Sequence, residues 1–288
     1  MTTEEHPKPG IRQANEAVGA IGHEFIGVVE GIGPGVEKVR KGDFVIAPLR
    51  SATTPAPTAR PGTTGRRNPR SRAPGPYDDA QLASLLALSD VMGTGYHAAV
   101  SAGVKPGDTV AVVGDGAVGL CGIIAAKLLE AKHILALSRH PARQALAREF
   151  GATTLVEDRG AAAIQKVLDL TGGIGVDAVL ECVGTDEANQ TAFSIARPGA
   201  VIGRVGVPHQ VEISAVGTFF RNVGMRGGPA PVKAYMDVLL PAVLEGRIQP
   251  GKVFDLVTDL DHIQQAYQAM DERRAVKVLL KVSELGGS

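Results

Sequence analysis

Short apolar runs alternate with segments of helical length over the middle of the chain. The intervening segments include a helix of small residues that extends to Lys127 and a second helix at 141–150 that ends before Gly151. Strands that alternate with helices are typical of βαβ units, so the pattern predicts an α/β fold with a mostly parallel, doubly wound sheet. The predicted strands occupy residues 109–114, 133–138, 154–157, 177–184 and 200–206.

A different pattern flanks this region on both sides. Residues 25–33 and 42–49 are two runs rich in β-branched residues, joined by a connection that contains Gly and Pro, which predicts an antiparallel β unit. Nearer the C-terminus we expect a helix at 234–246, a second helix with Asp261 as its N-cap, and a final strand at 275–282.

Residues 51–76 have an unusual composition. They contain no Val, Ile, Leu, Phe or Met and no acidic residue, but many Pro and Arg. Because this segment has nothing to bury, it cannot offset its ordering entropy, and we expect it to be disordered.

The 288-residue chain is long for one hydrophobic core, so we expect two domains.

Composition and charge exclude several classes of protein. Hydrophobic residues make up 44% of the chain and charged residues 21%, which excludes wholesale disorder. The 30 Lys and Arg balance the 30 Asp and Glu, so no single-sign field favours nucleic acid or an anionic membrane as a partner. The cysteines, Cys121 and Cys182, are too few for a disulfide framework or a structural zinc cluster. Without an apolar run of about 20 residues, we expect a cytoplasmic protein.

A glycine-rich turn follows the first strand of the α/β region. Gly114, Gly116 and Gly119 form a G-x-G-x-x-G pattern between a predicted strand and a predicted helix. In this context the first Gly permits a tight turn, the second lets a pyrophosphate approach the backbone, and the third permits close helix packing. The pattern predicts a dinucleotide site, with a Gly-rich turn in an unrelated α/β fold as the alternative.

The end of the next strand indicates which dinucleotide is bound. NAD-binding domains commonly place an acidic residue there to hold the ribose hydroxyls, whereas this chain has Ser138 and Arg139. A hydroxyl and a guanidinium hold a 2′-phosphate through charge-assisted hydrogen bonds, so they favour NADP over NAD. If Arg139 instead only stacks on adenine, the choice between NADP and NAD stays open.

Candidate metal ligands lie upstream of the glycine turn. His23 and Glu24 immediately precede a predicted strand, and Asp90 lies just before the nucleotide-binding region. A catalytic zinc uses three protein ligands of these types and leaves a fourth position for the substrate. The alternative is a surface His–Glu pair without a metal. We expect His97 to be a packing or capping residue.

Seven segments together resemble the zinc-dependent medium-chain alcohol dehydrogenases: GHEFIGVVEGIG, KVRKGDFVIAP, SDVMGTGYHAA, VKPGDTVAVVGDGAVGL, LAREFGAT, GGIGVDAVLECVG and RVGVP. The resemblance extends from about residue 20 to the C-terminus, except for 51–76. It implies a partial GroES-like catalytic domain at 1–93, a Rossmann NAD(P)-binding domain at 94–228, and a return to the catalytic domain at 229–288.

The resemblance also implies roles for individual residues. His23, Glu24 and Asp90 would be the catalytic and metal-binding residues, with Asp90 in the place that other branches give to Cys. The implied cofactor-binding residues are Thr94, Gly114, Gly116, Ala117, Val118, Gly119, Ser138, Arg139, Val183, Gly184, Val205 and Val207.

The chain also departs from this family. Its members carry a first zinc ligand, usually Cys, and a proton-relaying hydroxyl in a β segment before the Gly-His-Glu motif, and we expect both to be missing here. A structural zinc lobe with four cysteines would stand at residues 51–76, where no cysteine occurs. We interpret this segment as a coding stretch read out of frame, a hypothesis that sequencing of the locus would test.

Three functions follow from these observations. The first is an NADP(H)-dependent, zinc-type alcohol dehydrogenase with a small alcohol or carbonyl substrate, in which the missing thiolate weakens zinc binding and impairs activity. The second is an inactive NADP(H)-binding remnant. The third is a zinc-free quinone-type reductase, against which the set of His23, Glu24 and Asp90 argues. A homo-oligomer is compatible with each of the three.

Overall fold

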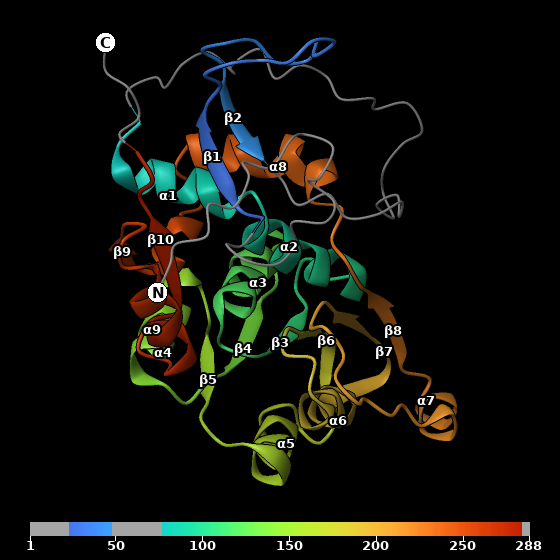
Figure 1. Ribbon diagram of the computed structural model, residues 1–288. Helices are drawn as coiled ribbons and strands as arrows, with labels where there is room; N and C mark the ends of the chain where they lie inside the picture. Colours follow the sequence, from blue (N-terminus) through green and yellow to red (C-terminus); the bar gives the residue numbers. More distant parts are fainter. Residues whose placement is uncertain (1–22, 48–76, 284–288) are drawn as a thin grey trace.

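The computed structural model describes residues 23–47 and 77–283, and its centre is a six-stranded parallel sheet (Figure 1). The strand order is β5-β4-β3-β6-β7-β8, which is the doubly wound arrangement that the alternating pattern predicted. The strands are β3 (Thr109–Val113), β4 (His133–Leu137), β5 (Thr154–Val156), β6 (Val176–Glu181), β7 (Ala196–Arg204) and β8 (Gly224–Gly227). Sequence analysis missed β8, because its sequence GMRG has no apolar run.

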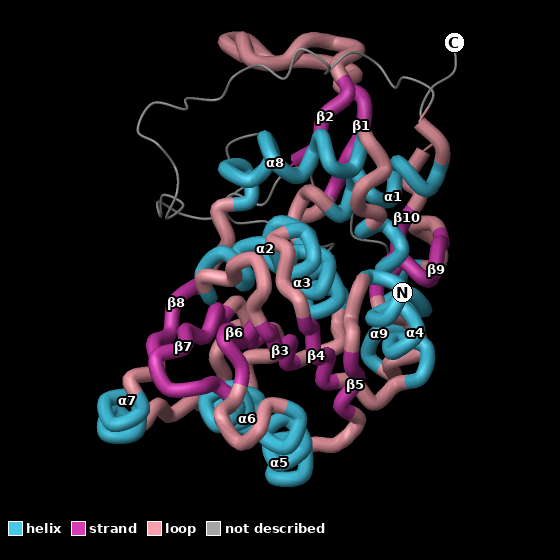
Figure 2. Tube along the Cα trace, turned by 180° about the vertical axis from the view of Figure 1, so that it is seen from behind, coloured by secondary structure: helices cyan, strands magenta, loops and turns pink. Residues whose placement is uncertain are grey.

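Helices cover both faces of this sheet, as Figure 2 shows from behind. Strand β3 explains why: Val110 and Val112 belong to one hydrophobic cluster, whereas Ala111 and Val113 belong to another. Successive side chains of a strand point to opposite faces, so a strand apolar at every position is buried on both sides. The first cluster includes α2 (Val91–Ala102), α3 (Ala117–Leu128) and α4 (Pro141–Phe150), and the second includes α5 (Gly160–Leu170) and α6 (Asp186–Ile195).

Helices α2 and α3 approach each other unusually closely. A Cβ atom added at Gly95 of α2 would lie 2.6 Å from the backbone nitrogen of Gly122 in α3. Such a contact leaves no room for a side chain, so the two helix backbones touch directly. This packing matters for function, because α2 begins beside Asp90 and α3 begins at the glycine-rich turn.

The remaining elements, except α7 between β7 and β8, lie to the N- and C-terminal sides of the sheet region. Strands β1 (Phe25–Val28) and β2 (Phe44–Ala47) pair antiparallel, with Phe25 opposite Ala47, which confirms the predicted β unit. The other elements are α1 (Asp79–Ala87), α7 (Ala215–Arg221), α8 (Val232–Leu244), the 3-10 helix η1 (Pro250–Val253), α9 (Ile263–Asp271), and the parallel pair of β9 (Phe254–Thr258) and β10 (Lys277–Leu280). The expected disorder at 51–76 lies outside the described residues.

The predicted cap of α9 is wrong. The N-cap is His262 rather than Asp261, and no side-chain capping bond forms there. The carboxylate of Asp259 explains the shift, because its Oδ1 accepts hydrogen bonds from the backbone N–H of His262 at 3.1 Å and contacts His262 Nδ1 at 2.6 Å. The side chain that organises this turn is therefore Asp259, two residues before the predicted Asp261.

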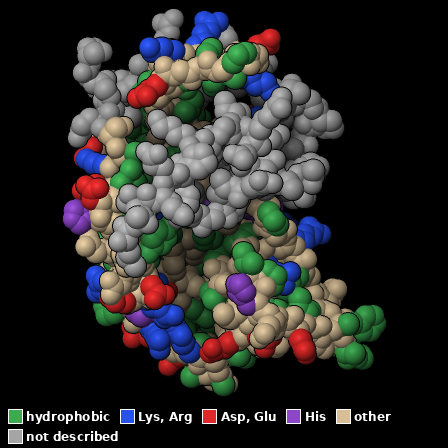
Figure 3. Space-filling model, viewed as in Figure 1, with side chains coloured by type: hydrophobic (Ala, Val, Ile, Leu, Met, Phe, Trp, Pro, Cys, Tyr) green, Lys and Arg blue, Asp and Glu red, His purple; other side chains and the backbone are tan. Residues whose placement is uncertain are grey.

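Helix α7 carries an exposed apolar tip. The side chains of Phe219 and Phe220 are 78% and 80% exposed. They pack edge to face against each other, with ring centroids 5.4 Å apart. Figure 3 shows this tip as the hydrophobic group that protrudes at the lower right of the molecule. None of the helices described at 77–283 is both long and apolar enough to cross a membrane.

A buried polar pair joins α2 to α8. Nδ1 of His97 lies 2.7 Å from the hydroxyl of Tyr235, and both side chains are buried, so the expectation that His97 is a packing residue is confirmed. Burial lowers the pKa of His97, although a backbone hydrogen bond to Gly227 opposes that shift. The imidazole is therefore held neutral, with the Tyr235 hydroxyl as a hydrogen-bond partner inside the core.

Replacing this tyrosine tests how strongly the pair holds α8 against α2. Tyr235→Phe removes the hydroxyl and leaves the buried Nδ1 of His97 with the longer contact to the Ser101 hydroxyl, at 3.4 Å, so the free energy of unfolding should fall by about 1–3 kcal/mol. Urea denaturation followed by circular dichroism measures the change. Tyr77→Phe is the matched control, because the Tyr77 ring packs on Phe44 and its hydroxyl bonds to nothing in the described part of the chain. Equal losses in both variants would contradict the assignment.

Candidate active site

Two segments far apart in the sequence bring His23 and Asp90 together. His23 stands two residues before β1, and Asp90 immediately precedes α2. The Nε2 atom of His23 lies 2.7 Å from Oδ2 of Asp90. Asp90 makes no side-chain cap to the helix, and its Oδ1 instead accepts a hydrogen bond of 2.6 Å from the Thr94 hydroxyl. Both oxygens of this carboxylate are thus engaged, one with His23 and one with Thr94.

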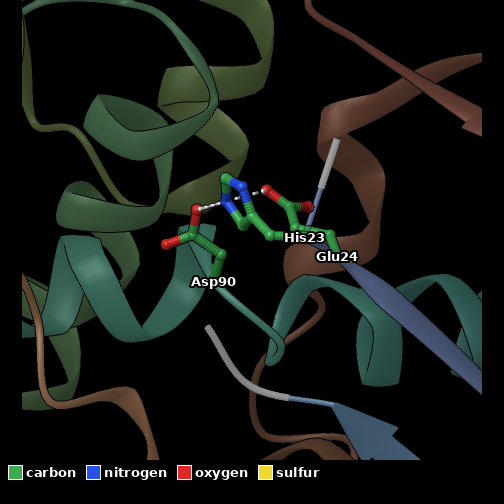
Figure 4. A group of neighbouring side chains, drawn as sticks. All are labelled: His23, Glu24 and Asp90. Atoms are coloured by element: carbon green, nitrogen blue, oxygen red, sulfur yellow. Dashed lines mark hydrogen bonds and ion pairs between the residues drawn. The ribbon is translucent and has the colours of Figure 1, made fainter. Parts of the chain in front are cut away.

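Glu24 completes the cluster on the other side of the imidazole. Figure 4 shows the His23 ring between the two carboxylates. Oε1 of Glu24 lies 4.0 Å from His23 Nε2 and accepts a hydrogen bond of 2.9 Å from the Lys277 ammonium. Oε2 of Glu24 is buried and has no hydrogen-bond partner among the residues that the structure describes. Burial raises the pKa of Glu24 above its usual value, and the Lys277 ammonium opposes this shift by favouring the carboxylate.

The three predicted metal ligands therefore form one group. One ligand atom from each of His23, Glu24 and Asp90 lies within 4.8 Å of the others. An imidazole nitrogen and two carboxylate oxygens are all zinc ligands, and three of them leave a fourth position for substrate. A buried carboxylate oxygen without a partner is costly unless something binds it. The donor set and the unpartnered Oε2 of Glu24 both fit a catalytic zinc ion.

The cysteines take no part in this group. Cys121 and Cys182 are both free, and Cys121 is buried in α3. Burial raises the pKa of each thiol, so neither is a ready thiolate ligand. The family's first zinc ligand and its proton-relaying hydroxyl, which we expected to be missing, would fall before Gly22, outside the described residues.

A separate cleft of about 460 Å³ opens at the carboxyl ends of the parallel strands. Its wall includes Gly114 and Gly116 after β3, Ser138 and Arg139 after β4, and Val183 after β6. Ligands of open α/β sheets bind at this edge, where the strand order reverses on either side of β3.

The glycine turn has the geometry that a pyrophosphate site requires. Gly114 has a φ of +113°, and a Cβ atom at Gly119 would lie 2.0 Å from the Gly114 carbonyl oxygen. A Cβ atom at Gly116, by contrast, would meet no atom within 4 Å, so space remains above the backbone at this position. Helix α3 then begins at Ala117 and Val118 without a side-chain cap. Uncapped N–H groups at a helix N-terminus form an anion site.

Ser138 and Arg139 lie in the cleft, but the structure adds two neighbours. The Ser138 hydroxyl donates a hydrogen bond of 2.9 Å to Oδ2 of Asp115, the residue between the first two glycines. Arg143, from the first turn of α4, binds Oδ1 of the same carboxylate at 3.2 Å. Sequence analysis missed both residues. Asp115 is visible within the motif, but its partners depend on how the β3 turn folds against β4.

The residues expected at the nicotinamide end form a second group beside the cleft. Of this group Val183 lines the cleft, whereas Gly184, Val205 and Val207 do not. A Cβ atom at Gly184 would lie 2.0 Å from the Val207 carbonyl oxygen, so the loops after β6 and β7 touch. Thr94 does not line the cleft, and its hydroxyl donates to Asp90.

Glu181 organises these loops and was also missed. This residue is fully buried at the end of β6, and its Oε1 accepts hydrogen bonds from the backbone N–H groups of Val183 and Gly184, at 2.8 and 2.7 Å. Its backbone oxygen accepts from Val205 N–H at 2.9 Å. A buried acid within an apolar strand is a signal that the sequence offered, because an ionised group is buried only with hydrogen-bond partners.

Known proteins are similar to this chain in sequence. Residues 117–230 match the family of zinc-binding dehydrogenases. A probable zinc-binding alcohol dehydrogenase of Mycobacterium tuberculosis is 30% identical over 86% of this chain and 70% of its own length. An NADP-dependent isopropanol dehydrogenase of Thermoanaerobacter brockii is 32% identical over 67% of this chain and 56% of its own length.

A solved structure agrees with these matches. The alcohol dehydrogenase TADH from Thermus sp. ATN1 superposes with a TM-score of 0.75 at 29% identity, over 92% of this chain and 84% of that one. The similarity therefore covers the sheet region and the segments on both sides of it. From the site geometry and these relatives together, the chain belongs to the zinc-dependent alcohol dehydrogenases of the medium-chain superfamily.

Proposed function

We propose that the protein transfers hydride between a small alcohol, or the corresponding carbonyl compound, and NADP(H), with a zinc ion held by His23, Glu24 and Asp90. The observation that carries this proposal is the position of the ligand cluster: Asp90 stands at the start of α2, whose backbone touches α3, the helix of the glycine turn. Asp90 and the glycine turn are thereby held by two helices whose backbones are in contact.

The chain's own residues set up the chemistry in defined ways. Zinc, when bound, supplies a Lewis acid that polarises the substrate oxygen. The hydrogen bond from Thr94 to Oδ1 of Asp90 fixes the carboxylate so that Oδ2 faces His23. Such supporting contacts orient metal ligands and maintain their affinity. Lys277 binds Oε1 of Glu24, the carboxylate oxygen that lies 4.0 Å from His23 Nε2, and so holds this side chain at the cluster.

The preferred cofactor is proposed to be NADP(H), with NAD(H) as a second cofactor. Arg139 lines the cleft after β4, where an acidic residue would repel a 2′-phosphate. In the same proposal the glycine turn and the first turn of α3 bind the pyrophosphate, and Val183, Gly184, Val205 and Val207 border the nicotinamide. The name of the Thermoanaerobacter brockii relative supports the same cofactor.

An inactive NADP(H)-binding remnant is the second candidate, and one observation favours it. The cleft is lined by residues at the strand ends and by Arg273, and none of the three metal ligands contributes to its wall. Nucleotide binding can therefore survive where zinc binding is weak. A zinc-free quinone-type reductase is a poorer fit, because such an enzyme has no use for the group of His23, Glu24 and Asp90.

We also propose a division into a partial catalytic domain at 1–93, a nucleotide-binding domain at 94–228 and a C-terminal return at 229–288. The ion pair between Glu24 and Lys277 supports this division, since it joins the first part to the last.

A homo-oligomer is proposed because the exposed Phe219 and Phe220 would bury apolar surface in a contact between copies.

Zinc content tests the metal site directly. Protein equilibrated with zinc and then desalted should retain one equivalent, and His23→Ala should lower the affinity by at least about 10-fold, because a lost ligand weakens the site at least as much as a lost supporting contact. Mass-spectrometric metal analysis provides the measurement, with alcohol oxidation as a second readout. The control is His209→Ala, since His209 is an exposed histidine outside the cluster.

Each outcome separates the candidate functions. Zinc and turnover that are lost together in His23→Ala support the dehydrogenase. Nucleotide binding by the wild type without zinc or turnover supports the remnant, and metal-free reduction of a quinone supports the third function. Equal zinc retention in His23→Ala and His209→Ala would show that the metal site is elsewhere.

Substitution of Arg139 tests the cofactor choice. Arg139→Asp should weaken NADPH binding by about 1.5–3 kcal/mol, the range for charge-assisted hydrogen bonds, and should affect NADH far less. Fluorescence titration of each nucleotide measures both affinities. Arg148→Asp changes the charge equally at an exposed position of α4 that does not line the cleft, and both affinities should stay within twofold of the wild type. Equal losses of NADPH and NADH in Arg139→Asp would refute the assignment.

A further inference from the structure

An acidic residue stands inside the glycine-rich turn, where a bound nucleotide brings its own negative charge. Asp115 lies between Gly114 and Gly116 and lines the cleft. Both of its carboxylate oxygens are engaged, Oδ2 by the Ser138 hydroxyl at 2.9 Å and Oδ1 by the Arg143 guanidinium at 3.2 Å. The side chains of Asp115 and Arg143 are only 16% and 13% exposed, so water screens this ion pair weakly.

The hydrogen bond to Asp115 uses the single donor of the Ser138 side chain. A serine hydroxyl carries one O–H, and a phosphate oxygen without a proton can only accept. Ser138 is 5% exposed, and its backbone is fixed by a bond from its N–H to the Val156 oxygen at 3.0 Å and by Gln144, which donates to its carbonyl at 2.8 Å. In this arrangement the hydroxyl donates to Asp115 and not to a ligand.

Arg143 keeps further N–H donors, so Asp115 affects it through charge and orientation. Its guanidinium is oriented by Asp115, and the two charges balance each other. Of the two guanidinium groups beside Ser138, that of Arg139 makes no ion pair among the described residues, whereas that of Arg143 does. A 2′-phosphate must therefore compete with the Asp115 carboxylate for Ser138 and Arg143, and it also meets the negative charge of Asp115.

NAD(H), whose ribose has a free 2′-hydroxyl, interacts with Asp115 in a different way. That hydroxyl is neutral and is itself a donor, so a carboxylate repels it far less than it repels a phosphate and can accept its hydrogen bond. We propose that Asp115 is a specificity-determining residue, which competes with the 2′-phosphate for Ser138 and Arg143 and thereby lets the protein accept NAD(H) beside NADP(H). This inference rests on the proposed function, since it concerns the same dinucleotide cleft.

The ratio of the two nucleotide affinities is the quantity to measure. Asp115→Ala frees the Ser138 hydroxyl and the Arg143 guanidinium, so NADPH should bind roughly tenfold more tightly, a change at the lower end for a charge-assisted hydrogen bond. NADH should bind equally or more weakly. Asp115→Asn keeps the shape of the turn and removes only the charge, so it should shift the ratio in the same direction by a smaller factor.

Two further variants separate competition from a general charge effect. Asp158→Asn removes one negative charge from the same cleft without touching Ser138 or Arg143, so it should shift the ratio less than Asp115→Asn does. Ser138→Ala should weaken NADPH binding less in the wild type, where the hydroxyl is engaged by Asp115, than in the Asp115→Ala background, where it should cancel part of the gain.

The outcomes distinguish this inference from the proposed function. If the wild type binds neither NADPH nor NADH in fluorescence titration, the proposed function fails. If both bind, and folded Asp115→Ala and Asp115→Asn leave the ratio of their Kd values unchanged, only the role of Asp115 is refuted. Equal effects of Asp158→Asn and Asp115→Asn, or equal effects of Ser138→Ala in both backgrounds, would likewise overturn it.

Discussion

The contact between α2 and α3 is the constraint on which the functional geometry depends. Gly95 lies against Gly122, and no side chain fits between the two backbones. Interiors pack as densely as organic crystals, so a bulkier residue would have to push one helix away. Asp90 begins one of these helices and the glycine turn begins the other, so their distance is set by backbone contact and not by flexible side chains.

Acidic side chains with little solvent exposure occur at each functional part of the molecule, and each carboxylate has different hydrogen-bond partners. Glu24 has Lys277 on one oxygen and no partner among the described residues on the other. Glu181 gives one oxygen to two backbone N–H groups at the end of β6. Asp115 is shared between a hydroxyl and a guanidinium. A buried carboxylate without partners is costly, so these contacts show which strand ends and loops are held in place for a ligand.

Much of the fold could be predicted, because its pattern is local. Short apolar runs that alternate with segments of helical length predicted the parallel region, and the structure buries β3 on both faces, as in a sheet covered on both sides. The misses have local causes as well. Strand β8 consists of GMRG and has no apolar run, and the start of α9 was misplaced because Asp259 competes for the backbone of His262.

The sequence by itself determined the doubly wound sheet, the glycine turn and the residue types of the metal cluster, since each is encoded within a few neighbouring positions. Only the tertiary structure decided which side chains meet. The ammonium of Lys277 reaches Glu24 across 253 positions of the chain, and Asp115 binds Ser138 and Arg143 because β3 and β4 are neighbours in the sheet. A hydrogen bond tolerates changes of only a few tenths of an ångström in the distance between donor and acceptor. That distance follows from the packing of the whole chain and not from the spacing of the two residues along it.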